Sequence, residues 1–322
     1  MSELDRRRFL KASASFGALG AIGAVGATGL MASGMPARAQ GAKDAALPEV
    51  LQKQIPSTGE AIPAVGLGSW ITFNVGNDME LRDQCADVMS AFFKAGGRMI
   101  DSSPMYGSAQ DVIGYGLDAL GAHDKVFSTD KVWTSGDGAD QIAETSDRWK
   151  VEQFDLLQVH NLLGINDNLP LLFRMKDAGQ LRYVGVTTSH GRRTDDLMAV
   201  MKNERLDFVQ VTYNPVDRKV EEYLLPMAYD RGIAVIVNRP FRGGSLTERL
   251  EGQPLPEFAR ELEVKSWAQL ILKYLIAHPA VTCPIPATTK PAHAAENMAA
   301  ATGPLPDDKM REQIAAVIGV LV

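Results

Sequence analysis

Four residues with side chains suited to proton transfer lie close to the ends of short apolar segments of the chain. Asp101, Lys131 and His160 each stand at or near such an end, and Tyr106 follows Asp101 closely. A phenol has an ordinary pKa of about 10, which is too high for an efficient acid near neutral pH. A neighbouring ammonium lowers that pKa, and a carboxylate paired with the ammonium keeps it charged. With a neutral imidazole to orient the oxygen, this set suits protonation of a carbonyl group as a hydride arrives.

Each of these residues also has an ordinary structural interpretation. Asp101 can cap a helix, Lys131 can be a solvated charge, His160 can be a core histidine, and Tyr106 can be a loop aromatic. Taken singly, these interpretations are the better ones. Occurrence together at neighbouring strand ends favours a shared site instead, because the active sites of parallel barrels lie at the carboxyl ends of their strands.

Short apolar segments and longer amphipathic segments alternate along the chain from residue 60 onward. The predicted strands are residues 62–68, 98–102, 126–133, 154–160, 184–188, 208–213, 234–237 and 281–286. The predicted helices are residues 80–95, 111–120, 141–149, 169–178, 195–203, 220–230, 266–277 and 293–300. A polar, glycine-rich loop is expected over residues 242–263, and one extra helix over residues 309–320.

Eight strand–helix units in about 240 residues predict a single (β/α)8 TIM barrel with an extra C-terminal helix. An open doubly wound sheet is the alternative, but it usually has a G-x-G-x-x-G turn after its first strand. No such turn occurs at residues 66–70. No boundary divides the chain after its N-terminal segment, so residues 40–322 are expected to form one domain.

Several ordered segments of the sequence resemble the aldo/keto reductase family. One is similar to that family's Asp-x4-Tyr-Gly-x-(Ser/Ala) signature, and others match its lysine-bearing third strand and histidine-bearing fourth strand. The matching segments are residues 62–68, 99–108, 129–132, 156–161 and 208–215. The resemblance implies that Tyr106 is the general acid/base, that Lys131 and Asp101 tune it, and that His160 orients the carbonyl.

The resemblance also implies a nicotinamide cofactor, NADP(H), with NAD(H) as the alternative. The residues implied to bind it are Asn161, Thr187, Thr188, Gln210, Arg239, Thr288, Lys290, His293 and Asn297. The family's commonest cofactor segment has Lys-Ser after a proline and an arginine a few residues on. Here Ala287 follows the proline and His293 stands at the arginine position, while Lys290 can still reach a 2′-phosphate.

Residues 237–240 lack the aromatic side chain that many family members stack on the nicotinamide. Arg239 is expected to contact the cofactor there, with a surface salt bridge as the alternative. Trp70, Met105 and Trp133 follow the first three predicted strands and could line an apolar substrate pocket, with packing at the barrel mouth as the alternative.

Composition excludes several other classes of protein. The formal net charge of -6 gives little support for a nucleic-acid partner, because phosphate binding requires a basic surface. The two cysteines, Cys85 and Cys283, exclude a disulfide scaffold and are expected to be buried thiols. The five histidines show no metal-ligand spacing, so no metal site is predicted.

The N-terminal segment resembles a twin-arginine export signal, whose usual form is Arg-Arg-x-Phe-Leu-Lys. Residues 6–11 read Arg-Arg-Arg-Phe-Leu-Lys, the next charge is Arg38, and residues 37–39 form a small-x-small cleavage pattern. We therefore expect a signal peptide over residues 1–39, the twin-arginine export machinery as a partner, and a periplasmic mature protein that is not embedded in a membrane. The alternative is an uncleaved anchor, since the uncharged run is long enough to span a bilayer.

The expected function is reduction of a small-molecule aldehyde or ketone, or the reverse reaction. Two alternatives come from other classes of protein. One is a nicotinamide-sensing regulatory subunit with weak catalysis, since some proteins that resemble this family are accessory subunits of ion channels. The other is a barrel isomerase or hydrolase without nicotinamide, which would leave the placement of Tyr106 and Lys131 unexplained.

Overall fold

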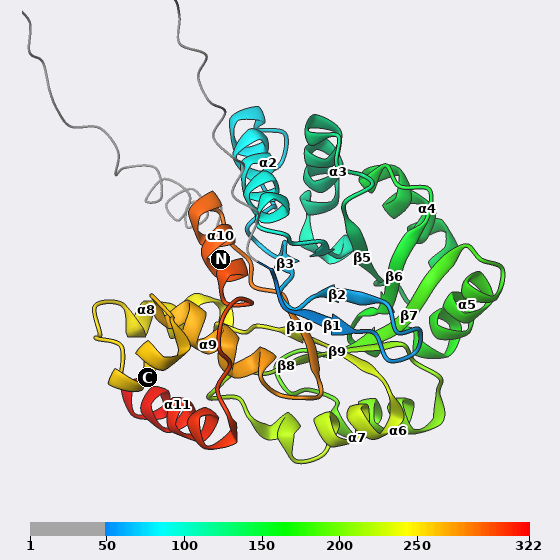
Figure 1. Ribbon diagram of the computed structural model, residues 1–322. Coiled ribbons are helices and arrows are strands. Elements are labelled where there is room, and N and C mark those ends of the chain that lie inside the picture. Colours follow the sequence, from blue (N-terminus) through cyan, green and yellow to red (C-terminus); the bar gives the residue numbers. More distant parts are fainter. Residues whose placement is uncertain (1–48) are drawn as a thin grey trace, which may run out of the picture. The chain divides into compact units, whose positions relative to one another are not determined.

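Eight parallel strands form the centre of the structure, which is a computed structural model that describes residues 49–322 (Figure 1). Each strand pairs with the next one along the chain. The sheet closes because the Gly66 N–H donates to the Pro284 carbonyl at 2.9 Å and the Gly68 N–H to the Pro286 carbonyl at 3.0 Å. The strands are β3 (Leu67–Gly68), β4 (Met99–Asp101), β5 (Phe127–Val132), β6 (Phe154–Val159), β7 (Leu181–Thr187), β8 (Phe208–Thr212), β9 (Ala234–Asn238) and β10 (Val281–Pro284). The predicted (β/α)8 barrel is confirmed.

Helices follow the strands and cover the outside of the barrel (Figure 1). The α-helices are α2 (Met79–Lys94), α3 (Ala109–Leu120), α4 (Gly138–Trp149), α5 (Ile165–Asp177), α6 (Thr194–Asn203), α7 (Leu224–Arg231), α8 (Ser245–Leu250), α9 (Trp267–Ile276), α10 (Pro291–Ala299) and α11 (Asp308–Leu321). Short 3-10 helices are η1 (Pro104–Tyr106), η2 (His160–Leu162), η3 (Lys219–Glu221), η4 (Arg242–Gly244) and η5 (Glu257–Leu262). The helix α11 is the extra C-terminal helix that the sequence predicts.

Local signals in the sequence explain where several helices begin and end. The Asp78 side chain caps α2 by accepting the Leu81 N–H at 3.2 Å. Just beyond the end of α2, Gly96 has a φ of +88°, a left-handed conformation that favours glycine. The Ser266 hydroxyl caps α9 by accepting the Gln269 N–H at 3.2 Å. These caps fix the helix ends, and the apolar faces then pack against the barrel.

The expectation of one strand over residues 62–68 is wrong in part. Residues Ala61–Pro63 form β2, which pairs antiparallel with β1 (Gln52–Gln54), and only Leu67–Gly68 belongs to the barrel. The fully buried Ile55 and Ile62 of this hairpin share a core cluster with the first residues of β4, β5, β8 and β9. The hairpin therefore closes the amino-terminal end of the barrel. A continuous apolar run gave no sign of the division between β2 and β3.

The loop expected over residues 242–263 is also wrong in part, because η4, α8 and η5 all lie within it. Leu246, Leu250 and Leu262 are buried and anchor these short helices to the core. Each helix is too short for a helical period to be visible in the sequence. The helix α5 begins at Ile165, four residues before its predicted start, and α7 is preceded by η3 in the predicted helix over residues 220–230.

The predicted export signal over residues 1–39 lies outside the described residues. Within residues 49–322, no helix is both long enough and apolar enough to cross a membrane. Cys85 and Cys283 are buried free thiols, as expected. Burial raises the pKa of the Cys85 thiol to about 12, so it is not a nucleophile near neutral pH.

Candidate active site

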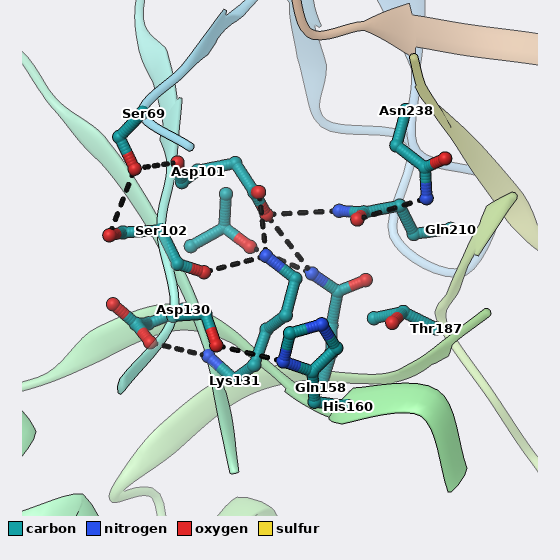
Figure 2. Close-up of polar contacts among 12 residues, drawn as sticks. Ser69, Asp101, Ser102, Asp130, Lys131, Gln158, His160, Thr187, Gln210 and Asn238 are labelled. Carbon is teal, nitrogen blue, oxygen red and sulfur yellow. Dashed lines mark hydrogen bonds and ion pairs between the residues drawn. The ribbon is translucent and has the colours of Figure 1, made fainter. Parts of the chain in front are cut away.

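A buried ion pair joins the neighbouring strands β4 and β5 inside the barrel (Figure 2). The Lys131 Nζ donates to Asp101 Oδ2 at 2.6 Å and to the Ser102 carbonyl at 2.6 Å. The exposed fraction is 0% for the Lys131 side chain and 2% for that of Asp101, so water hardly screens the pair. Asp101 Oδ1 accepts further hydrogen bonds from the side chains of Gln210 at 2.9 Å and Gln158 at 3.5 Å.

The charges of this pair depend on each other. Burial alone would lower the pKa of Lys131, but the charge and hydrogen bond of Asp101 raise it above its ordinary value. Burial raises the pKa of Asp101, and the Lys131 ammonium together with the glutamine hydrogen bonds opposes this rise. Lys131 is therefore a cation near neutral pH, with Asp101 as its counter-ion.

Tyr106 is the last residue of η1, in the segment that follows β4. Its ring centroid lies 5.0 Å from the Lys131 Nζ and 5.9 Å from the His160 ring centroid, with the two rings edge to face. Burial raises the pKa of Tyr106 above its ordinary value, and the Lys131 charge opposes the rise. The lysine thus acts in the expected direction, but the expectation that the phenol pKa is lowered overall is wrong, because burial has the larger effect.

His160 follows the last residue of β6 and begins η2. Its side chain is buried, and its Nδ1 lies 2.8 Å from the Ser103 Oγ. Burial and the nearby Lys131 charge lower the pKa of His160 to about 3, so the imidazole is neutral near physiological pH. The structure therefore brings together Asp101, Tyr106, Lys131 and His160 in one sector of the barrel mouth.

Thr187 and Gln210, two of the polar residues expected at later strand ends, also lie near this sector, together with Asn238 (Figure 2). The Asn161 N–H donates to Thr187 Oγ1 at 3.3 Å. The Asn238 side chain donates to the Thr188 carbonyl at 2.9 Å and to Gln210 Oε1 at 3.4 Å. Gln210 also donates to Asp101, so it connects the Asn238 side chain to the buried ion pair.

Three residues of this region are absent from the sequence-based site: Ser103, Gln158 and Asn238. Gln158 points into the barrel two residues before His160, and Asn238 ends β9. A polar amide at an inward position of an apolar strand is a signal that would have identified both. Ser103 gives no comparable signal, because its contact with a residue 57 positions away depends on the fold.

The residues expected to bind the adenosine phosphate lie around the start of α10. Thr288 is buried, and its hydroxyl accepts the Lys290 N–H at 3.1 Å. Lys290 directly precedes α10, and His293 lies in its first turn; both side chains are exposed. Asn297 is buried farther along α10. Free N–H groups and a cation at a helix start suit an anion.

Arg239 follows β9 and has a φ of +52°. It makes no ion pair with any residue in the range 49–322, whereas its neighbour Arg242 pairs with Asp217 at 3.3 Å. Its positive φ turns the backbone sharply after the strand, and the Asn214 side chain donates to the Arg239 carbonyl at 3.2 Å. The surface salt bridge considered as an alternative for Arg239 is therefore not found in this part of the chain.

Trp70, Met105 and Trp133 remain substantially exposed after the first three strands of the barrel. Their exposed fractions are 42%, 46% and 40%, which are high for large apolar side chains. Lining of a substrate pocket and packing at the barrel mouth both stay predictions for these three side chains. Met105 belongs to η1 together with Tyr106, whereas Trp70 and Trp133 follow β3 and β5.

These features describe a (β/α)8 barrel with titratable side chains grouped at the carboxyl ends of its strands. In residues 49–322, no cluster of three or more histidine, cysteine or acidic side chains is arranged to hold a metal ion. The sequence profile of the aldo/keto reductase family matches residues 64–318. The chain belongs to the aldo/keto reductase family and is accordingly an oxidoreductase.

Curated relatives are similar over most of the chain. The aldo-keto reductase YhdN of Bacillus subtilis is 26% identical, over 61% of this chain and 63% of that protein. The NADH-specific methylglyoxal reductase of Escherichia coli is 24% identical, over 69% of this chain and 78% of that protein. The methylglyoxal reductase YeaE of Escherichia coli is 26% identical, over 77% of this chain and 89% of that protein.

Solved structures share the fold. An aldo/keto reductase from Klebsiella pneumoniae, solved with NADP and acetate, superposes with a TM-score of 0.67 at 21% identity, over 81% of this chain and 93% of that one. An aldo/keto reductase from Brucella melitensis superposes with a TM-score of 0.66 at 22% identity, over 84% of this chain and 100% of that one. At these sequence identities the superpositions show a shared barrel fold and nothing more specific.

Proposed function

We propose that this protein reduces aldehydes or ketones to alcohols, or catalyses the reverse oxidation, with Tyr106 as general acid/base and NADP(H) as cofactor. The observation that carries the proposal is the assembly of Tyr106 and His160 beside the buried Lys131–Asp101 pair. An acid, a permanent cation and a neutral hydrogen-bonding imidazole in one place meet the needs of carbonyl protonation.

The bound cofactor supplies or accepts the hydride, and the side chains of the chain handle the proton. In the reductive direction Tyr106 donates its phenolic proton to the carbonyl oxygen and becomes a phenolate. The Lys131 ammonium, 5.0 Å from the ring centroid, stabilises that phenolate. Asp101 keeps the ammonium charged and in place. His160, neutral at physiological pH, orients the carbonyl oxygen by hydrogen bonding.

The donor set fits a nicotinamide dinucleotide. Neutral amides and hydroxyls in β8 and at the ends of β6 and β7 (Asn161, Thr187, Thr188, Gln210) suit a carboxamide, and the half-buried Arg239 without a carboxylate partner in residues 49–322 suits a phosphate. Lys290 at the start of α10 would contact a 2′-phosphate, which favours NADP(H) over NAD(H). Relatives differ on this point, since one is named NADH-specific and another was solved with NADP.

Trp70, Met105 and Trp133 would form the walls of the substrate pocket in this proposal. Their exposed apolar surfaces suit the carbon skeleton of a small carbonyl compound. Relatives named methylglyoxal reductases make methylglyoxal a sensible first probe, together with simple aldehydes and quinones.

The test is loss of reduced-nicotinamide absorbance when these carbonyl compounds are added to the purified protein with NADPH or NADH. A Tyr106→Phe variant is the matched control, because it removes one hydroxyl and keeps the ring. We expect turnover that falls by about 100-fold or more in the variant. Cofactor binding without turnover in a folded protein would favour a nicotinamide-sensing role, and absence of both would favour a barrel without nicotinamide chemistry.

We also propose that the protein is exported by the twin-arginine route and acts in the periplasm, with cofactor bound before export. The support is the Arg-Arg-Arg-Phe-Leu-Lys sequence at residues 6–11 ahead of a cofactor-binding barrel. Replacement of Arg6 and Arg7 by lysine should leave the protein in the cytoplasmic fraction. Equal fractionation of the variant and the wild type, or exported protein that lacks tightly held cofactor, would contradict this proposal.

A further inference from the structure

The hydrogen-bond partner of His160 is a buried serine that belongs to the same segment as Tyr106. The Ser103 side chain is fully buried, and its Oγ lies 2.8 Å from the His160 Nδ1. The same Oγ accepts the Met105 N–H at 3.2 Å, which caps the start of η1. One hydroxyl therefore contacts both the histidine and the turn that carries Tyr106.

A count of hydrogens decides how the serine and histidine share their protons. A hydroxyl has one proton and two lone pairs, and the Met105 N–H occupies one lone pair. If His160 donated from Nδ1, the Ser103 proton would need another acceptor. No other partner of this hydroxyl exists among the residues that the structure describes. That arrangement would leave a buried donor unpaired, which is costly.

The opposite arrangement pairs every group. The Ser103 O–H donates to the His160 Nδ1, the Met105 N–H donates to the Ser103 Oγ, and the imidazole proton lies on Nε2. A neutral imidazole with its proton on Nε2 can donate a hydrogen bond from that atom. With the proton on Nδ1, the Nε2 atom would be an acceptor and would repel a carbonyl oxygen.

We propose that Ser103 is a positioning residue that holds His160 in the tautomer with the proton on Nε2, so that this N–H faces the substrate carbonyl oxygen. The inference rests on the proposed carbonyl reduction for its consequence, but not for the tautomer itself. Since Ser103 also caps η1, it sets the histidine donor and the tyrosine acid in one hydrogen-bonded unit.

The direct test is long-range proton–nitrogen NMR of the imidazole rings in the full-length protein labelled with nitrogen-15. The sequence has five histidines, and a His160→Gln spectrum identifies the signals of His160. We expect a proton-bearing Nε2 and an unprotonated Nδ1 in the wild type. A wild-type spectrum with the proton on Nδ1 would overturn the proposal without reference to any variant or activity.

The second test compares Ser103→Ala with Ser103→Thr, which retains the hydroxyl. We expect Ser103→Ala to lower kcat for methylglyoxal about 10-fold, with an unchanged KM for NADPH, and to shift the His160 signals toward a mixture of tautomers. Ser103→Thr should restore both. In the His160→Gln background, Ser103→Ala should cause no further loss of kcat. Unchanged His160 signals and kcat in a folded Ser103→Ala protein would refute the role.

The two tests also separate this inference from the proposed function. A wild type that turns over no carbonyl compound, but has the proton on Nε2, would refute the reductase proposal and leave the tautomer assignment intact. An active wild type with the proton on Nδ1 would do the reverse.

Discussion

The buried pair of Lys131 and Asp101 allows a stability prediction that is independent of any substrate. In an Asp101→Asn variant the side chain keeps its shape, and its oxygen can still accept from Gln210. The Lys131 ammonium, however, keeps only the Ser102 carbonyl as a strong partner. Removal of one member of a buried pair costs about 3–5 kcal/mol of unfolding free energy, because the other charge is left uncompensated. The negligible exposure of both side chains argues for the full effect.

The reciprocal variant should be destabilised for the same reason. Lys131→Met leaves the Asp101 carboxylate buried without its cation, and burial already raises the pKa of this group. The double variant Asp101→Asn/Lys131→Met contains neither charge. We expect the double variant to lose less unfolding free energy than the sum of the two single losses, by about 2 kcal/mol or more, because residues of a shared buried pair are strongly coupled.

The assay is urea unfolding followed by tryptophan fluorescence at pH 7, for the wild type, both single variants and the double variant. An exposed pair, Arg193 with Asp196 at 2.9 Å, provides the matched control. Asp196→Asn should cost no more than about 1 kcal/mol. Additive single effects at the buried pair, or a loss equal to that of the exposed control, would refute the assignment of a charged, water-excluded pair. All three buried-pair variants should lose reductase activity, including the double variant whose stability recovers.

Three further predictions concern single residues. Since burial lowers the pKa of His160 to about 3, kcat/KM between pH 5 and 8 should show no step from it; a step that disappears in His160→Gln would contradict this. Burial raises the pKa of Asp130 to about 7, so the folded state holds this proton more tightly than the unfolded state between about pH 4 and 7. Unfolding free energy should therefore fall as pH rises through that window, by up to about 1.4 kcal/mol per pH unit, and it should fall less steeply in Asp130→Asn. Urea unfolding that gives the same pH dependence for the wild type and Asp130→Asn would contradict this prediction. Lys290→Ala should raise KM for NADPH about 10-fold and leave KM for NADH unchanged, and initial rates that change equally with both cofactors would remove its role at the 2′-phosphate.

Alternating periodicity was sufficient to predict the barrel, and strand-end polarity was sufficient to predict that the four residues of the candidate site lie together. Asp101, Lys131 and His160 lie at or beside the ends of strands that are otherwise apolar, and that property is local. The hairpin of β1 and β2 was not predictable in the same way, because Ile62 belongs to an apolar run that continues into the first barrel strand. What divides the run is the packing of Ile55 and Ile62 against the barrel end, which is a tertiary contact.

The state of each group in the site was harder to predict than its position. A lysine beside a tyrosine suggests a lowered phenol pKa, and Lys131 does act in that direction on Tyr106. Burial outweighs it, and the depth of burial depends on helices and loops far away in the sequence. The contact between Ser103 and His160 belongs to the same class of property, since both residues are ordinary in their local context.

The strand β5 shows how the barrel holds an ammonium at a fixed point inside an apolar interior. Thr129, Asp130 and Lys131 follow one another and are all buried, which would be costly without partners. Alternation along the strand directs Lys131 inward to Asp101, while Asp130 faces the helices and accepts from the Trp149 indole at 2.7 Å. Asp130 Oδ1 also accepts the backbone N–H of Lys131 at 2.6 Å. The lysine is thus anchored by its ammonium on one face of the strand and by its own amide on the other, so a change at Asp130 should affect the position of the ammonium as well as stability.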